Sequence, residues 1–184
     1  MESDEDLIVA YVSGDERAFT RLVERHLSAV YTYAVRFAGQ SDAEDITQET
    51  FLKAWKNIRR YSSTTARFKT WLMRIARNTA IDYLRKRKSI PLSSFEDTDG
   101  NFLDIADEGA LPEELTSVAY DAREIERALK DLPPNYREII TLYYDKDLTL
   151  QETAHILEIP LNTAKSRFRR ALASLRKALH PKLV

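Results

Sequence analysis

The 184-residue sequence predicts an all-α protein: two small helical domains joined by a flexible acidic linker, with a helix-turn-helix in the C-terminal domain. Three observations support this fold class. Apolar residues recur every three or four positions along most of the chain, which is the spacing of one helix face. No segment alternates apolar and polar residues as a half-buried strand does. Charge is strongly segregated, which predicts domains at residues 1–90 and 117–184 and a linker at 91–116.

The formal net charge of −1 conceals this segregation. Residues 53–88 hold twelve Lys and Arg against one acid, whereas residues 89–122 hold nine acids and no Lys or Arg. Residues 1–52 are acidic, and residues 123–184 are basic. Such blocks predict two basic surfaces for nucleic acid, an acidic surface for another partner and an acidic connector.

Composition excludes several classes of site. The chain has no cysteine, so it can form neither a disulfide nor a thiolate metal centre, and its three histidines are scattered. We expect no cofactor and no metal. The N-terminus is acidic where a secretory signal would be basic, and no long apolar run follows. We therefore expect a cytoplasmic protein, monomeric when free, with no direct membrane insertion.

The first predicted helix begins after Asp15, a suitable N-cap, and runs to about Ala38, where Gly39 closes it. Its core-facing stripe comprises Phe19, Leu22, Val23, Leu27, Val30, Ala34 and Phe37. The second predicted helix opens at Ser41, where the sequence Ser-Asp-Ala-Glu predicts a capping box with Glu44.

Acids lie on one face of this second helix at three- and four-residue spacing. Asp42, Asp45 and Glu49 could chelate Mg²⁺ in a metal-dependent nuclease, or they could form a docking surface. We favour docking or a simply solvated face over metal binding, because the first turn of a helix attracts acids through its dipole without any metal.

A polar loop from Tyr61 to Arg67 precedes a long predicted helix from about Phe68 to Lys88. Basic residues interleaved with aromatic ones suit single-stranded or melted nucleic acid, since cations follow phosphates while aromatic rings and pockets hold bases. Trp71 is expected in the core. The loop is the better candidate for base contact, because loops on a rigid scaffold commonly carry recognition.

Four helices are predicted after the linker. The first runs from about Ser117 to Asp131, and Pro133-Pro134 begins the next. The Leu148–Leu179 stretch then predicts two helices joined by a tight turn. Thr149 and Glu152 have capping-box spacing. Pro160 breaks the run, and the last helix is expected to begin near Asn162 or Thr163.

This last helix alternates an apolar stripe with cations, and no acid follows Glu158. An ordinary helical hairpin with a solvated basic face is the plain alternative. The cationic density without any compensating acid favours a helix-turn-helix that places its second helix in the major groove of DNA.

Several segments resemble the extracytoplasmic-function (ECF) sigma factors of bacteria, in the family's order and over nearly the whole chain. They are SGDERAFTRLVERH, DAEDITQETFLKAW, FKTWLMRIARNTAIDYLRKRK, LPPNYREIITLYY and IPLNTAKSRFRRALASLR. The resemblance implies a non-enzymatic initiation factor that binds core RNA polymerase, directs it to promoter DNA and helps melt the minus-ten region. It also implies regulation by an anti-sigma factor. The alternative is a stand-alone helix-turn-helix regulator.

The resemblance further implies a role for three groups of residues. Polymerase docking would fall to Asp42, Asp45, Gln48, Glu49 and Phe51. The minus-ten element would be contacted by Tyr61, Ser62, Ser63, Thr64, Arg67, Lys69, Arg74, Arg77, Asn78, Arg85 and Lys86. The minus-thirty-five element would be contacted by Thr163, Lys165, Ser166, Arg167, Arg169 and Arg170. The sequence departs from the family at Glu158 and Asn162, where Gly is frequent. Glu158 would be strained if the turn keeps a left-handed residue.

Overall fold

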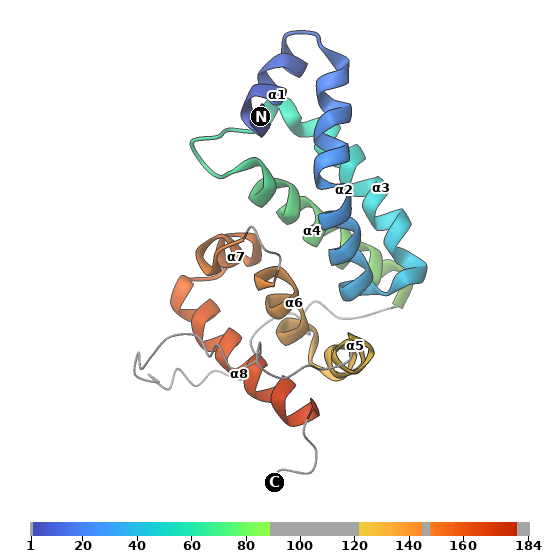
Figure 1. The fold of residues 1–184 in the computed structure, drawn as a ribbon, viewed down its shortest axis with the longest axis vertical. Helices are drawn as coiled ribbons and strands as arrows, with labels where there is room; N and C mark the ends of the chain where they lie inside the picture. The colour runs from blue at the N-terminus through green and yellow to red at the C-terminus, as the bar shows by residue number, and fades with distance from the viewer. Residues whose placement is uncertain (1, 89–121, 145–147, 180–184) are drawn as a thin grey trace.

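The computed structural model of the chain describes residues 2–88, 122–144 and 148–179. Within these ranges every regular element is helical, which confirms the all-α fold class. The N-terminal half contains α1 to α4 and the C-terminal half contains α5 to α8, and the two halves lie against each other (Figure 1). None of the described helices is long and apolar enough to cross a membrane.

The chain begins with a helix that the sequence analysis did not predict, α1 (Asp4–Val12). The Ser3 hydroxyl accepts from the Asp6 backbone N–H at 3.1 Å, and the Ser3 backbone N–H donates to the Asp6 carboxylate at 2.9 Å. This reciprocal capping box starts the helix. The acids Asp4, Glu5 and Asp6 therefore belong to a capped first turn, where the helix dipole favours them.

Helix α2 (Glu16–Ala38) has Asp15 as its N-cap and Gly39 as its C-cap, as predicted. Helix α3 (Gln40–Asn57) starts directly after Gly39, and the predicted capping box between Ser41 and Glu44 is wrong. Gly39 has φ 97° and serves both helices at once, so Ser41 already lies inside α3 and cannot cap it. A short 3₁₀ helix, η1 (Ile58–Arg60), follows α3.

Helix α4 (Phe68–Lys88) matches the predicted long helix, and Phe68, Leu72 and Ala76 are buried along its inner face. It packs against both α2 and α3, so these three long helices enclose the N-terminal core. One residue of the predicted α2 stripe departs from this core: Leu27 is 46% exposed.

The C-terminal half contains α5 (Ala122–Asp131), α6 (Pro134–Tyr143), α7 (Leu150–Leu157) and α8 (Leu161–Leu179). Pro134 occupies the first turn of α6 as predicted. The predicted linker at 91–116, and the predicted start near Ser117, lie outside the described residues. Helix α8 begins one or two residues before the predicted position, because the Pro160 carbonyl accepts from the Ala164 backbone N–H at 3.0 Å and closes a turn there.

Helices α7 and α8 form the predicted helix-turn-helix, and the capping box between Thr149 and Glu152 is present. Glu158 ends α7 with φ 57° and ψ 38°, the left-handed conformation that strains a residue with a Cβ. It is the one non-glycine residue with positive φ in the described part of the chain.

Glu158→Gly is therefore expected to stabilise the C-terminal domain by about 1 kcal/mol, because glycine adopts this conformation without strain. Urea unfolding followed by circular dichroism measures the change. Gln151→Gly, at an exposed position inside α7, is the control and should destabilise by about 1 kcal/mol. A lower stability of Glu158→Gly would show that the Glu158 side chain contributes more than its backbone strain costs.

Candidate nucleic-acid and protein interfaces

The acidic face of α3 divides into a buried and an exposed part. The Asp42 side chain is 3% exposed, and its carboxylate accepts from Arg87 Nη1 at 2.6 Å. Asp45 is exposed and accepts from the Tyr83 hydroxyl at 2.8 Å. Asp42 thus joins α3 to α4 inside the domain, whereas Asp45 remains accessible to a partner. No group of three or more His, Asp or Glu residues in the described ranges could hold a metal ion.

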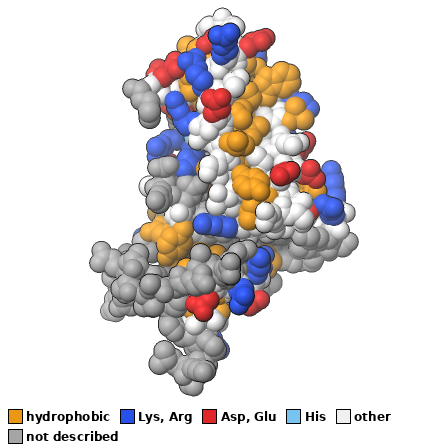
Figure 2. All heavy atoms as spheres, turned by 45° about the vertical axis from the view of Figure 1, so that its right-hand side comes forward, with side chains coloured by type: hydrophobic (Ala, Val, Ile, Leu, Met, Phe, Trp, Pro, Cys, Tyr) orange, Lys and Arg blue, Asp and Glu red, His pale blue; other side chains and the backbone are white. Residues whose placement is uncertain are grey.

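Further along α3, polar and apolar side chains share the outer surface. Gln48 and Glu49 are exposed, and Phe51 is half-buried. The sequence analysis did not select two further residues for docking: Leu52 is 43% exposed and Trp55 is 49% exposed. Their three-residue spacing puts both on one side of α3. Figure 2 shows hydrophobic side chains gathered in a band over the upper, N-terminal part of the molecule.

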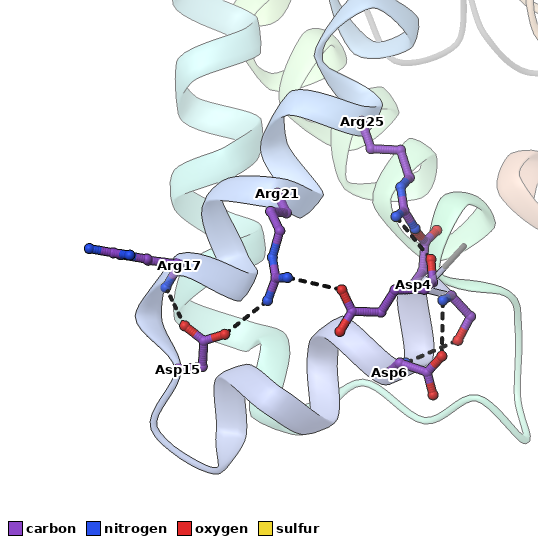
Figure 3. A network of polar contacts seen from close by, with 8 residues as sticks. Asp4, Asp6, Asp15, Arg17, Arg21 and Arg25 are labelled. Atoms are coloured by element: carbon purple, nitrogen blue, oxygen red, sulfur yellow. Dashed lines mark hydrogen bonds and ion pairs between the residues drawn. The ribbon is translucent and has the colours of Figure 1, made fainter.

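Helix α1 is attached to α2 by ion pairs (Figure 3). Arg21 contacts Glu2 at 3.0 Å and Asp15 at 2.8 Å, and Arg25 contacts Asp4 at 2.6 Å. Asp4 also lies 2.8 Å from Nε2 of the buried His26. Burial alone would raise the pKa of Asp4, but His26 and Arg25 outweigh it and hold that pKa below its usual value.

This attachment also positions the polar loop between η1 and α4. The Tyr61 hydroxyl donates toward Glu5 of α1 at 3.2 Å and toward the Ala66 carbonyl at 3.1 Å. The Tyr61 ring packs against Phe68 and Trp71, at centroid distances of 5.6 and 5.5 Å. Tyr61 therefore anchors the base of the loop in this conformation.

The loop itself presents small polar side chains. Ser62, Ser63 and Thr64 are exposed, and the Ser62 and Thr64 hydroxyls lie 2.8 Å apart. The Thr65 backbone N–H donates to the Ser62 backbone carbonyl at 3.1 Å, and this bond closes the loop into a turn. These three predicted minus-ten residues are therefore accessible at the surface of the loop.

The predicted DNA-binding side chains of α4 fall into two groups. Lys69 is half-buried, and Arg74, Asn78, Arg85 and Lys86 are exposed. Arg77 is different, because its side chain is only 12% exposed. Sequence spacing could not separate Arg77 from the others, since the burial comes from the C-terminal domain.

Three ion pairs join the region around α4 to the C-terminal domain. Arg77 Nε donates to Oε1 of Glu138 on α6 at 2.8 Å. Arg74 Nε lies 3.2 Å from Oε1 of Glu158 at the end of α7. Arg67 Nη1 lies 3.3 Å from Oε1 of Glu152 on α7. One domain therefore covers part of the surface that the sequence analysis assigned to DNA in the other.

Glu138 is the most buried of these acids, with none of its side chain exposed. Burial raises its pKa, and the charges of Arg77 and Arg167 oppose that rise. The Tyr33 hydroxyl on α2 donates to the same Oε1 at 3.4 Å. Burial beside the Glu138 carboxylate raises the pKa of Tyr33 well above its usual value.

Glu152 makes contacts both within α7 and with the N-terminal domain. It closes the capping box of α7 with Thr149, and it receives Arg67 and the Thr70 hydroxyl from the other domain. Burial alone would raise its pKa, but these hydrogen bonds and the Arg67 charge together hold the pKa below its usual value.

The predicted minus-thirty-five residues lie along α8, but not all on its surface. Thr163, Lys165, Ser166, Arg169 and Arg170 are half-buried. The Ser166 hydroxyl donates to the Thr163 carbonyl at 3.0 Å, as short polar residues commonly do within helices. Arg167, by contrast, is 3% exposed and lies close enough to Glu138 to lower that residue's pKa. Its burial means that Arg167 does not offer a DNA contact in this conformation.

Comparison with known families shows two matches along the chain. Residues 22–90 match the model of sigma-70 region 2, and residues 128–177 match the model of sigma-70 region 4. These ranges contain the three surfaces described above.

Curated relatives extend the match over nearly the whole length. An ECF RNA polymerase sigma factor of Bacillus subtilis, SigW, is 36% identical over 171 residues, which cover 90% of this chain and 91% of the relative. The ECF RNA polymerase sigma-E factor of Haemophilus influenzae is 30% identical over 189 residues, which cover 97% of this chain and 96% of the relative.

Solved structures show the same two-part helical fold. CnrH, in complex with the cytosolic domain of CnrY, matches with a TM-score of 0.70 at 25% identity, covering 97% of this chain and 98% of CnrH. The sigma factor RpoE, in complex with the anti-sigma factor NepR from Bartonella quintana, matches with a TM-score of 0.67 at 27% identity. The match covers 89% of this chain and 98% of RpoE.

Proposed function

The chain belongs to the ECF RNA polymerase sigma factors, which are transcription initiation factors, and from this we propose which of its surfaces carries each step of initiation. The N-terminal domain, residues 1–90, docks on core RNA polymerase and binds the minus-ten element. The C-terminal domain, residues 117–184, binds the minus-thirty-five element. The protein acts in the cytoplasm, where it positions polymerase and performs no catalysis itself.

Core polymerase docks on the outer face of α3 in this proposal. Asp45, Gln48 and Glu49 supply polar contacts, and the half-buried Phe51 borders the exposed Leu52 and Trp55. An apolar centre with a polar rim is the common composition of a protein–protein interface. Asp42 supports the surface from inside through Arg87.

The minus-ten element is bound by the loop and by α4. The exposed Ser62, Ser63 and Thr64 would receive an extruded nucleobase. Tyr61 fixes the start of the loop. Unstacking a base costs a few kcal/mol. Cations at the end of the loop and on α4 would offset that cost by contacting the phosphates on either side: Arg67, Lys69, Arg74, Arg77, Arg85 and Lys86, with Asn78 beside them.

The minus-thirty-five element is bound by the half-buried polar residues of α8. Lys165 and Arg169 lie one helical turn apart, which is the arrangement that lets two side chains reach into one major groove. Arginine to guanine O6 and N7 is the commonest specific contact of this kind. Thr163, Ser166 and Arg170 would add phosphate contacts that fix the register.

The observation that carries the proposal is the combination, in one chain, of the acidic face of α3, the basic face of α4 and the helix-turn-helix. Transcription by purified core polymerase on a pool of promoter fragments, with and without this protein, tests it directly. We expect sequence-selective initiation that depends on the protein and yields its promoter motif. Binding to DNA without any binding to core polymerase would favour a stand-alone helix-turn-helix regulator.

Asp45→Ala combined with Glu49→Ala is expected to weaken binding to core polymerase by about tenfold or more, because charged groups at a docking surface commonly contribute several kcal/mol. Fluorescence anisotropy with labelled protein and unlabelled core measures the affinity. Glu24→Ala, an exposed acid on α2, serves as the control and should leave the affinity unchanged. Intact core binding by the double variant would count against this docking face.

We further propose that an anti-sigma factor holds the protein inactive. The support is that CnrH and RpoE, which share its fold across most of the chain, are solved with CnrY and with an anti-sigma factor, respectively.

A further inference from the structure

Helix α1 lies outside the surfaces proposed above for polymerase and DNA. It also precedes the region 2 match, which begins at residue 22. It is nevertheless tightly packed on the N-terminal domain, because Leu7 and Ile8 are buried in the core. Asp4 pairs with Arg25 at 2.6 Å and lies 2.8 Å from Nε2 of His26 (Figure 3). A short helix attached at these points has a defined position relative to the rest of the domain.

Glu5 connects α1 to the polar loop between η1 and α4. It is half-buried, and its Oε1 accepts from the Tyr61 hydroxyl at 3.2 Å. The same hydroxyl lies 3.1 Å from the Ala66 carbonyl, so its one hydrogen is shared between two acceptors. Burial and the neighbouring Glu5 charge raise the pKa of Tyr61, and the hydroxyl therefore keeps this hydrogen at neutral pH.

These contacts fix the loop at both of its ends. The Tyr61 ring packs against Phe68 and Trp71 at the start of α4, and its hydroxyl reaches Ala66 at the other end of the loop. The four exposed hydroxyl-bearing residues, 62–65, lie between the two fixed points. A loop that is ordered before it binds loses less conformational freedom on binding, and its groups are held closer to the geometry that one ligand requires.

We propose that Glu5 is a positioning residue for recognition of the minus-ten element. Through the Tyr61 hydroxyl it fixes the conformation in which Ser62, Ser63 and Thr64 receive an extruded nucleobase, and it thereby sharpens the base preference of the loop. The inference rests on the proposed function of the loop and extends it to α1. Glu5 contacts no base in this proposal.

The sign of the expected effect separates positioning from simple electrostatics. An acid close to DNA repels phosphates, so its removal would strengthen DNA binding if charge alone mattered. The positioning role predicts the opposite change, a loss of base preference when Glu5 is truncated. It also predicts that this loss requires the Tyr61 hydroxyl.

Three variants of the full chain test the contact. Glu5→Ala removes the acceptor, whereas Glu5→Gln removes the charge but keeps an acceptor oxygen. Tyr61→Phe removes the donor and retains the ring. Glu24→Ala, at an exposed position on α2, removes the same charge as Glu5→Ala away from the loop and is the matched control. Circular dichroism melting of each variant checks that it folds.

Transcription with core polymerase on a barcoded pool of promoter fragments, randomised in both promoter elements, measures base preference at each element. We expect Glu5→Ala and Tyr61→Phe each to lower the preference at a minus-ten position by about three- to tenfold, the range for loss of one hydrogen bond. Glu5→Gln and Glu24→Ala should retain the wild-type preference. The minus-thirty-five preference should stay unchanged in every variant, and it serves as an internal control for folding.

The combined Glu5→Ala and Tyr61→Phe variant should lose no more preference than Tyr61→Phe alone, because Glu5 acts through that hydroxyl. Losses that add in the double variant would overturn the proposal. It would also be overturned by wild-type preference in Glu5→Ala, by equal losses in Glu5→Ala and Glu5→Gln, or by equal losses at both promoter elements.

A loop variant separates this inference from the proposed function. Ser62→Ala combined with Ser63→Ala and Thr64→Ala removes the hydroxyls of the loop and leaves Glu5 and Tyr61 in place. If this triple variant keeps the wild-type minus-ten preference, the assignment of the loop fails, and the role of Glu5 fails with it. If the triple variant loses preference but Glu5→Ala does not, only the role of Glu5 fails.

Discussion

Lys165→Ala combined with Arg169→Ala is expected to reduce promoter-specific transcription by about thirtyfold or more. Each contact to a base edge contributes about 1–3 kcal/mol of discrimination, and every 1.4 kcal/mol is a factor of ten. Both side chains are half-buried on α8, beside the core residues Phe168 and Leu172. Runoff transcription on a promoter recovered from the fragment pool measures the loss, and binding to core polymerase should not change.

Arg176→Ala combined with Lys177→Ala provides the control for this experiment. It removes the same charge from the same helix, two to three turns further along, so it reports the general electrostatic contribution of α8. We expect its effect to be several-fold smaller. Equal losses from both double variants would show that α8 attracts DNA through charge alone. A parallel loss of core binding by the Lys165 and Arg169 variant would indicate misfolding.

Glu138→Ala is expected to destabilise the C-terminal domain by about 3–5 kcal/mol, because removing one partner of a buried ion pair leaves the other charge uncompensated. Here the substitution removes a carboxylate that two arginines share. They are Arg167, which is 3% exposed, and Arg77 from the other domain. Urea unfolding of the full chain measures the effect. Glu158→Gln, which breaks only a solvent-exposed pair, should cost less than about 1 kcal/mol.

The two cations should respond differently to this change. Arg77 can return to water when the domains separate, whereas Arg167 belongs to the same helical core as Glu138 and cannot. Energy transfer between dyes on the two domains should therefore fall in Glu138→Ala. Glu138→Leu combined with Arg167→Met should recover much of the stability, because replacing a buried charged pair by apolar residues is often neutral or stabilising. A loss below about 1 kcal/mol in Glu138→Ala would show that water already solvates this site.

The helices were largely predictable from the sequence, because their signals are local. Asp15 and Gly39 delimit α2, Thr149 and Glu152 cap α7, and Pro134 begins α6. The family was predictable as well, since its segments occur in order along the chain. The short α1 was missed because nine residues give too little periodicity, although Ser3 and Asp6 carried its capping signal.

The roles of individual charged residues were decided by the tertiary structure. Arg167 and Arg169 are two positions apart in one basic run, yet Arg167 is buried beside Glu138 and Arg169 is only half-buried. Asp42 and Asp45 similarly share a helix face in the sequence, but Asp42 is buried and bound to Arg87, whereas Asp45 is exposed. Sequence spacing gives the angle of a side chain around its own helix. Its burial depends on which other helices cover that angle, and for Arg77 the covering helix comes from another domain 61 residues away along the chain.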